Sequence, residues 1–123
     1  MGFAADEIYE PVQEQMKKKH VREVGKLLPF DLAFAERAKI LGEHKSTRKY
    51  AQALVVQWAA LAQRVPEGKC ALVITHGGYI DDSAVACLPN ANHRKWGKTF
   101  SQCEGIRLAY DRDDFVSGEL LRI

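Results

Sequence analysis

Residues Cys70 to Gly78 read CALVITHGG, and this stretch decides the expected fold. Its first five residues form a continuous apolar run without the alternation of a half-buried strand. Such a run is typical of a strand covered on both faces, as in a parallel α/β sheet. The turn from Thr75 to Gly78 leads into a segment that keeps helical spacing up to Leu88. The order strand, glycine turn, helix predicts an α/β fold with a mostly parallel sheet and flanking helices.

Two helices are expected on the N-terminal side of this run. The first should be capped by Asp31 and stopped by Gly42, because apolar residues between them recur at helical spacing. The second should begin at about Ser46 and continue to Val65, where Pro66 ends it. Its long apolar stripe predicts a helix that packs one face against the core.

The two ends of the chain complete the expected architecture. Residues 8–12 are short, β-prone and interrupted by a proline, which predicts an edge strand or extended segment. Residues 106–110 and 115–123 flank a polar turn, a pattern that predicts a C-terminal β-hairpin. No repeat or linker divides the 123 residues, a length typical of one domain. We therefore expect residues 1–123 to form a single domain.

Composition narrows the class of protein. With 46% hydrophobic and 28% charged residues, the chain is typical of a soluble globular protein rather than a disordered one. No apolar run is long enough to cross a membrane. Its three cysteines form no C-x-x-C pair and no signal peptide is evident, so we expect a cytoplasmic protein with free, non-catalytic thiols and no membrane partner. Cys70 and Cys87 lie in apolar runs and should act as small hydrophobic residues.

Charge gives little indication of a partner. The formal net charge of +2 is too small to indicate a nucleic-acid binder without a concentrated patch. A basic run from Lys17 to Lys26 predicts an exposed helix face or loop. It contains no aromatic residue before Phe30, so it lacks a platform on which bases could stack. We expect no nucleic-acid partner.

The chemistry of the chain centres on His76. Ligands of open α/β sheets bind beyond the carboxyl ends of the strands, which is the expected place of this residue. Gly77 and Gly78 let the backbone approach a ligand, and the following helix offers N–H groups and a positive dipole end. These features suit a phosphate group, whose oxygens a histidine can bind. A histidine merely hydrogen-bonded at a tight turn is the open alternative.

The stretch from Thr75 to Ile80, with a helix on either side and a closing hairpin, resembles the second histidine motif of the histidine phosphatases, the phosphoglycerate mutase-like superfamily. The likeness is strong from Ala53 onward and loose from Ile8 to that point. It implies a partial phosphoglycerate mutase-like sandwich that hydrolyses phosphomonoesters or transfers phosphoryl groups through a phosphohistidine, without metal or other cofactor. His76 would then bind the phosphoryl group, and Glu14 loosely matches the family's general acid.

The sequence departs from the family in one decisive respect. No R-H-G nucleophile motif occurs, since His20, His44 and His93 each lack an arginine before them and a glycine after them. The arginine motif that should follow is also missing, so the chain looks like the later part of such a protein, truncated at its N-terminus. We expect little or no phosphatase activity, which leaves open whether the chain is an enzyme.

The alternative is a non-catalytic module that binds a phosphorylated small molecule, phosphate itself or another polypeptide. A homodimer through an exposed sheet edge is one form of it, because unpaired apolar strands invite association. The neighbouring Asp81 and Asp82 are expected to cap the helix after His76, or else to orient the histidine or contact a positive part of the substrate. His93 is expected on a basic surface loop.

Overall fold

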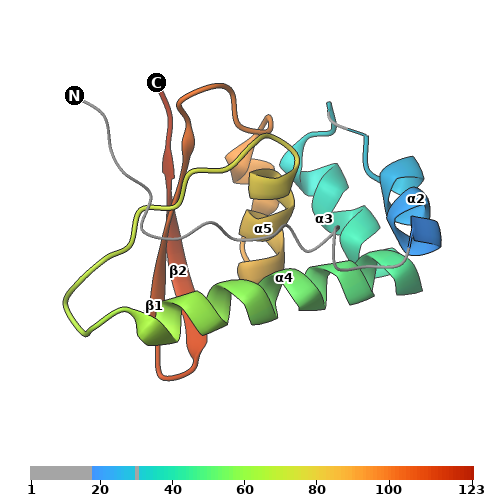
Figure 1. Cartoon of the computed structure of the whole chain (residues 1–123). Coiled ribbons are helices and arrows are strands. Elements are labelled where there is room, and N and C mark those ends of the chain that lie inside the picture. The colour runs from blue at the N-terminus through green and yellow to red at the C-terminus, as the bar shows by residue number, and fades with distance from the viewer. Residues whose placement is uncertain (1–17, 30) are drawn as a thin grey trace.

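The computed structural model describes residues 18–29 and 31–123, which form four α-helices and one antiparallel hairpin. The elements are α2 (Lys18–Leu27), α3 (Phe34–Glu43), α4 (Lys45–Arg64), α5 (Tyr79–Cys87), the 3-10 helix η1 (His93–Trp96), β1 (Gly105–Asp111) and β2 (Asp114–Leu121). Figure 1 shows α4 along one side of the molecule, with α2 near one of its ends and the hairpin near the other. Helices α3 and α5 lie between them, so the described chain is a helical layer flanked by one hairpin.

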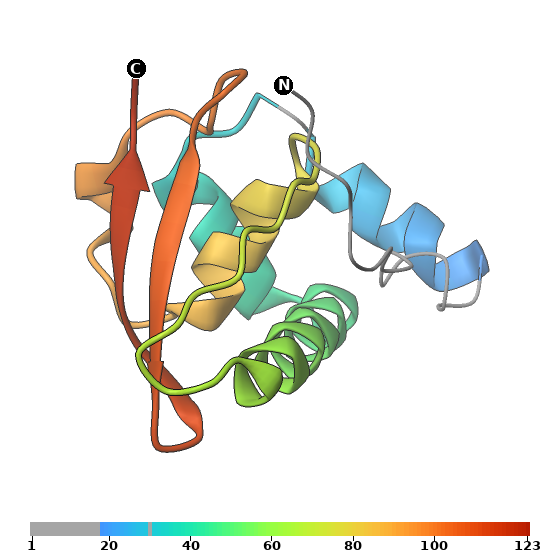
Figure 2. The same ribbon diagram turned by 60° about the vertical axis from the view of Figure 1, so that its left-hand side comes forward.

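Helix α5 forms the centre of this arrangement. Every residue of the helix except Ile80 is buried. It packs against α3 and α4, and the hairpin covers a further side through Ile106 and Leu120 (Figure 2). Small side chains such as Ala84 and Ala86 allow neighbours to approach from several directions. A helix buried all round is a core helix, so the residues at its start are held by the whole fold.

The two helices expected before residue 70 are present. Helix α4 matches the predicted range within one residue at each end, and Tyr50 and Leu54 on its inner face are fully buried. Helix α3 starts at Phe34 rather than directly after Asp31, and no side chain caps it. The predicted cap is therefore wrong. The N–H of Phe34 instead donates to the carbonyl oxygen of Gly97 at 3.0 Å. A loop distant in sequence thus satisfies one of the free N–H groups at the start of the helix.

The C-terminal hairpin is confirmed. Strands β1 and β2 pair antiparallel, from Gly105 opposite Leu121 to Asp111 opposite Asp114. The two turn residues Arg112 and Asp113 both have positive φ, at 50° and 69°. Such a two-residue turn matches the right-handed twist of the strands that it joins.

The hairpin approaches α5 most closely at Gly118. A Cβ atom built on this glycine would lie 2.5 Å from Cδ1 of Leu88 and 2.9 Å from Cδ1 of Ile106. Contacts under 3.0 Å do not occur at real Cβ atoms, so the absence of a side chain lets β2 lie against the end of α5.

The predicted mostly parallel sheet, and with it the partial phosphoglycerate mutase-like sandwich, is wrong. The sheet of the described residues is the hairpin alone, and residues 70–76 lie in no strand. Leu72 and Ile74 expose 76% and 80% of their surface, and no described backbone hydrogen bond outside the helices and hairpin involves residues 70–75. An apolar run becomes a central strand only when neighbouring strands pair with it. The edge strand expected at residues 8–12 lies outside the described residues.

Candidate functional site

His76 lies in an exposed segment directly before the start of α5. Its carbonyl oxygen accepts a hydrogen bond from Ile80 N at 3.1 Å, which joins the residue to the first turn of the helix. Its ring Nδ1 is 3.0 Å from the carbonyl oxygen of Gly77, and an N–H on this nitrogen donates to that oxygen. The ring lies beside that of Tyr79, with centroids 5.6 Å apart. The histidine is therefore hydrogen-bonded within a tight turn, as the alternative interpretation expected. This bond uses Nδ1, so Nε2 is the ring nitrogen that a ligand could contact.

The glycines shape the approach to the helix. Gly78 is the N-cap of α5 and has a φ of 78°, in the left-handed region that side chains disfavour. Its N–H donates to Oδ2 of Asp81 at 3.0 Å, while Oδ1 of the same carboxylate accepts from Phe100 N at 2.9 Å. The prediction that Asp81 caps the helix is confirmed. The same carboxylate ties the loop around Phe100 to the start of α5.

Asp82 has a different role from the predicted one. Its Oδ1 lies 2.7 Å from Nη1 of Arg37, and its Oδ2 accepts from the Tyr50 hydroxyl at 3.0 Å. Nη2 of Arg37 in turn donates to the carbonyl oxygen of Pro29 at 2.7 Å. Arg37 exposes only 1% of its surface and Tyr50 none. Asp82 is therefore not a cap but the centre of a buried ionic cluster.

Burial sets the proton affinities in this cluster. Removal from water raises the pKa of Asp82, and the Arg37 guanidinium opposes that rise. Removal from water also raises the pKa of Tyr50, which the nearby Asp82 carboxylate reinforces. The Tyr50 hydroxyl therefore stays protonated and acts as a donor.

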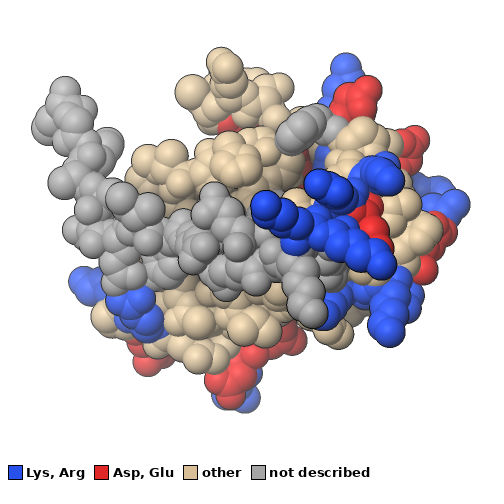
Figure 3. Space-filling model, turned by 45° about the vertical axis from the view of Figure 1, so that its right-hand side comes forward, with Lys and Arg blue, Asp and Glu red and all other residues tan. Residues whose placement is uncertain are grey.

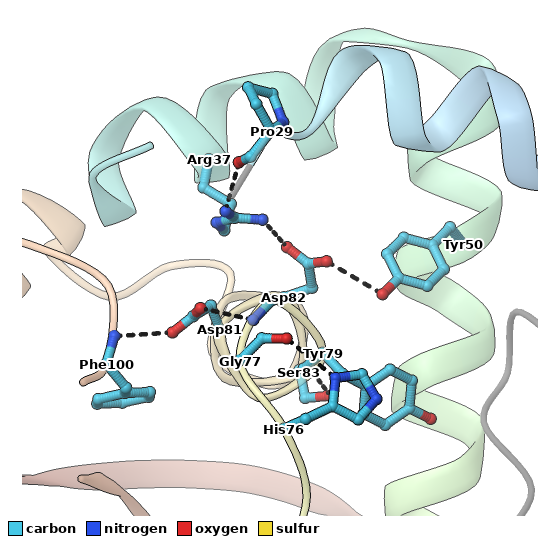
Figure 4. Close-up of polar contacts among 11 residues, drawn as sticks. Pro29, Arg37, Tyr50, His76, Gly77, Tyr79, Asp81, Asp82, Ser83 and Phe100 are labelled. Carbon is cyan, nitrogen blue, oxygen red and sulfur yellow. Dashed lines mark hydrogen bonds and ion pairs between the residues drawn. The ribbon is translucent and has the colours of Figure 1, made fainter. Parts of the chain in front are cut away.

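Figure 4 shows that the polar groups around the start of α5 point in three directions. Asp82 points toward Arg37 and Tyr50, Asp81 toward Phe100, and the His76 ring lies beside Tyr79. The hydrogen bonds of the two carboxylates involve other partners than His76. The alternative prediction, in which the carboxylates orient the histidine, is therefore wrong. The imidazole is left accessible at the positive end of the helix.

The remaining predicted residues lie elsewhere. His93 was expected on a surface loop but is buried in η1, with Nε2 2.9 Å from the carbonyl oxygen of Leu88 and its ring edge-on to Trp96. That prediction is wrong, because the ring fills the core. His44 lies at the junction of α3 and α4. Glu14 lies outside the described residues.

The cysteines divide by exposure. Cys87 is buried, as expected for a small hydrophobic residue, and burial raises the pKa of its thiol to about 12. Cys70 and Cys103 are exposed, so the expectation of a packed Cys70 is wrong. Within residues 18–29 and 31–123, no three His, Cys, Asp or Glu side chains gather in a way that could hold a metal ion.

Polar partners of α5 were the main feature that sequence reasoning missed. Trp58 Nε1 donates to the Ser83 hydroxyl at 2.8 Å, in addition to the cluster around Asp82. One signal was available, since Arg37 follows Phe34 by three residues and precedes Leu41 by four. An arginine on the apolar face of a helix needs a buried acceptor.

Comparisons with protein-family models, with curated proteins and with solved structures gave no match for this chain. Among the described helices, none combines the length and the apolar character needed to span a membrane.

Proposed function

We propose that this chain binds a phosphate-bearing ligand at His76, Gly77 and Gly78, in the manner of the second histidine of a histidine phosphatase, without turning it over alone. The observation that carries the proposal is the exposed imidazole at the N-terminal end of α5. A helix N-terminus favours anions, and a protonated imidazole adds a charged donor.

The two acids that follow do not cancel this preference. Arg37 neutralises the Asp82 carboxylate in the interior, 2.7 Å away. The Asp81 carboxylate bonds to two backbone N–H groups and points toward Phe100. These contacts support a phosphate site in spite of the two adjacent negative charges.

The absence of turnover follows from the missing nucleophile. Covalent phosphoryl transfer needs a second imidazole placed beside the phosphorus atom. Of the other described histidine rings, His93 is buried against Leu88 and His44 lies between α3 and α4. Neither is at the start of α5.

The test is titration of the chain with inorganic phosphate and with p-nitrophenyl phosphate. We expect saturable binding with amide shifts at Gly77 and Gly78, no release of p-nitrophenol, and about tenfold weaker binding for His76→Ala because a charged hydrogen bond is lost. His44→Ala, which changes an exposed histidine elsewhere, should bind as the wild type does. Turnover that disappears in His76→Ala would refute the non-catalytic assignment, and an absence of saturable binding would refute the phosphate site.

A second candidate function, self-association, is favoured by the exposed apolar segment. Residues 70–74 pair with a second copy in an antiparallel, twofold arrangement centred on Leu72, which places Cys70 opposite Ile74. This register puts every apolar residue of the segment opposite another, and unpaired apolar backbone invites such pairing.

Sedimentation tests the second candidate. We expect dimers of the wild type and monomers of Leu72→Asp. Val56→Asp is the matched control, because Val56 is a comparably exposed apolar residue on α4, at 69%. A wild type that stays monomeric at high concentration rules the dimer out.

A further inference from the structure

Two basic segments that are distant in the sequence meet at one end of the molecule. Helix α2 packs against α4, and Figures 1 and 2 place it beside the end at which α4 begins. We call Lys18–Leu27 and residues 45–49 together the basic end. Figure 3 shows Lys and Arg side chains gathered on this side of the molecule. The exposed cations of the basic end are Lys18, Lys19, Arg22, Lys26, Lys45, Arg48 and Lys49.

The small net charge of the whole chain conceals the positive charge of the basic end. The basic end holds seven basic residues and one acidic residue, Glu23, for a net charge of +6 at pH 7. Because the whole chain has a formal net charge of +2, all other residues together carry −4. Binding of nucleic acid needs a concentrated basic patch, and folding forms such a patch by bringing the two basic segments together.

Within the part of the chain that the structure describes, no acid neutralises the cations of the basic end. None of the seven has an ion-pair partner among the described residues. Glu43, the acid directly before this part of α4, lies 3.8 Å from Lys39 Nζ instead. Arg48 Nη1 donates to a neutral acceptor, the carbonyl oxygen of Gly42, at 3.1 Å.

The start of α4 breaks a rule of helix stability. Lys45 is its first residue, its first turn holds no acid, and no side chain caps it. A cation at the positive end of a helix dipole is unfavourable. Local rules broken at a surface are typical of functional sites, and an anionic partner would offset the positive charge at this helix end.

The kind of anion follows from what surrounds the cations. Val24 in α2 and Leu28 directly after the helix are buried, and the large exposed apolar residues of the described chain all lie outside the basic end. A lipid surface would find no apolar anchor here. Among the described residues, Tyr50 is the aromatic residue next to the basic end, and it is fully buried, so this part of the structure offers single-stranded bases no exposed ring on which to stack.

We propose that the basic end binds the phosphate backbone of double-stranded nucleic acid, without reading its sequence. Backbone binding needs Lys and Arg side chains at the surface but neither aromatic platforms nor apolar anchors. This surface includes neither His76 nor any residue of α5, so it does not depend on the phosphate-ligand site.

The experiment measures binding of a short fluorescent DNA duplex of mixed sequence by anisotropy over a range of salt concentrations. The variant Lys45→Glu/Lys49→Glu is compared with Lys69→Glu/Lys98→Glu, which reverses two exposed lysines outside the basic end. The first variant places an acid at the start of α4, where the dipole favours it, so its Tm should not fall below that of the wild type. His76→Ala is included to distinguish duplex binding at the basic end from phosphate binding at His76.

We expect wild-type affinity that falls steeply with salt and affinity about tenfold lower or more in Lys45→Glu/Lys49→Glu, with a shallower salt dependence. The control pair and His76→Ala should bind within about twofold of the wild type. No duplex binding at low salt, equal losses in both double variants, or loss in His76→Ala would overturn the proposal. So would equal or tighter binding to anionic vesicles or poly-glutamate at the same salt concentration.

Discussion

The buried pair of Arg37 and Asp82 ties the start of α5 to α3. The guanidinium links Pro29 to the helix, and the carboxylate also holds the Tyr50 hydroxyl. A buried ion pair adds little net stability over an apolar replacement, but removal of one partner leaves the other charge unpaired in the interior. The effects on stability of substitutions at Arg37 and at Asp82 should therefore depend on each other.

We predict that Asp82→Asn lowers the free energy of unfolding by about 3–5 kcal/mol, because Arg37 loses its counter-charge in the interior. Tyr50→Phe removes the hydrogen bond from the hydroxyl to Asp82 and should cost about 1 kcal/mol. Urea denaturation at neutral pH measures both. Equal losses in the two variants would show that the charge of Asp82 contributes nothing beyond its hydrogen bonds.

The thiols give a second prediction for single residues. In the native protein a thiol reagent should label Cys70 and Cys103, while Cys87 should react only after unfolding, because it is buried and burial raises the pKa of its thiol to about 12. Mass spectrometry of labelled peptides with and without denaturant checks this. Labelling of Cys87 at the rate of the other two would contradict its burial.

At the scale of elements, sequence patterns correctly predicted α3, α4, α5 and the hairpin, whereas the predicted central sheet was wrong. Stripes such as Tyr50 and Leu54 indicate a helix by local spacing alone, and a polar turn between two β-prone runs indicates a hairpin. Residues 70–74 are different, because a strand exists only with partners elsewhere in the chain. Their apolar composition predicts burial, yet no local signal states whether neighbouring strands are present.

The candidate site, like the fold, was predicted correctly only where local sequence determines it. The sequence placed His76 and the two glycines before a helix, and correctly gave Asp81 a capping role. The inward turn of Asp82 was not predictable, since it depends on Arg37, 45 residues away in the chain. Pairings between distant side chains leave no local pattern.

Two leucines distinguish the exposed segment from the helical core. We predict that Leu54→Ala lowers the free energy of unfolding by about 2–5 kcal/mol, because Leu54 is fully buried. The identical change at Leu72, which exposes 76% of its surface, should stay within about 0.5 kcal/mol in the monomer. Denaturation at low protein concentration measures both, and a large loss at Leu72 would mean that the segment is packed.

On the scale of the whole molecule, Arg122 connects parts of the chain that are far apart in sequence. It donates to the carbonyl oxygens of Trp96, Lys98 and Thr99, and Nη1 lies 3.0 Å from Oε1 of Glu104. Its guanidinium also lies over the rings of Phe34 and Phe100. The end of the hairpin, the loop after η1 and the start of α3 are thus joined through one side chain.

This connection should depend on pH through Glu104. Backbone hydrogen bonds from Ser101 and Ile123, together with Arg122, lower the pKa of this carboxyl from its usual 4.5. A lowered pKa in the folded state contributes stability above pH 4.5 that is lost as the pH falls through the folded pKa. We predict that the Tm difference between the wild type and Glu104→Gln is largest at neutral pH and narrows in acid. Calorimetry across that range checks it, and a constant difference would contradict the assignment.

The close approach at Gly118 limits which sequences this fold can accept. In a library of single substitutions selected for folded protein, the neighbouring Ser117 and Glu119 are exposed and should tolerate many side chains. Position 118 should favour glycine, since even a methyl group there would have to displace the ends of the Leu88 and Ile106 side chains. The hairpin can thus diversify freely on its outer surface, whereas a substitution at this one point requires the side chains beneath it to shift.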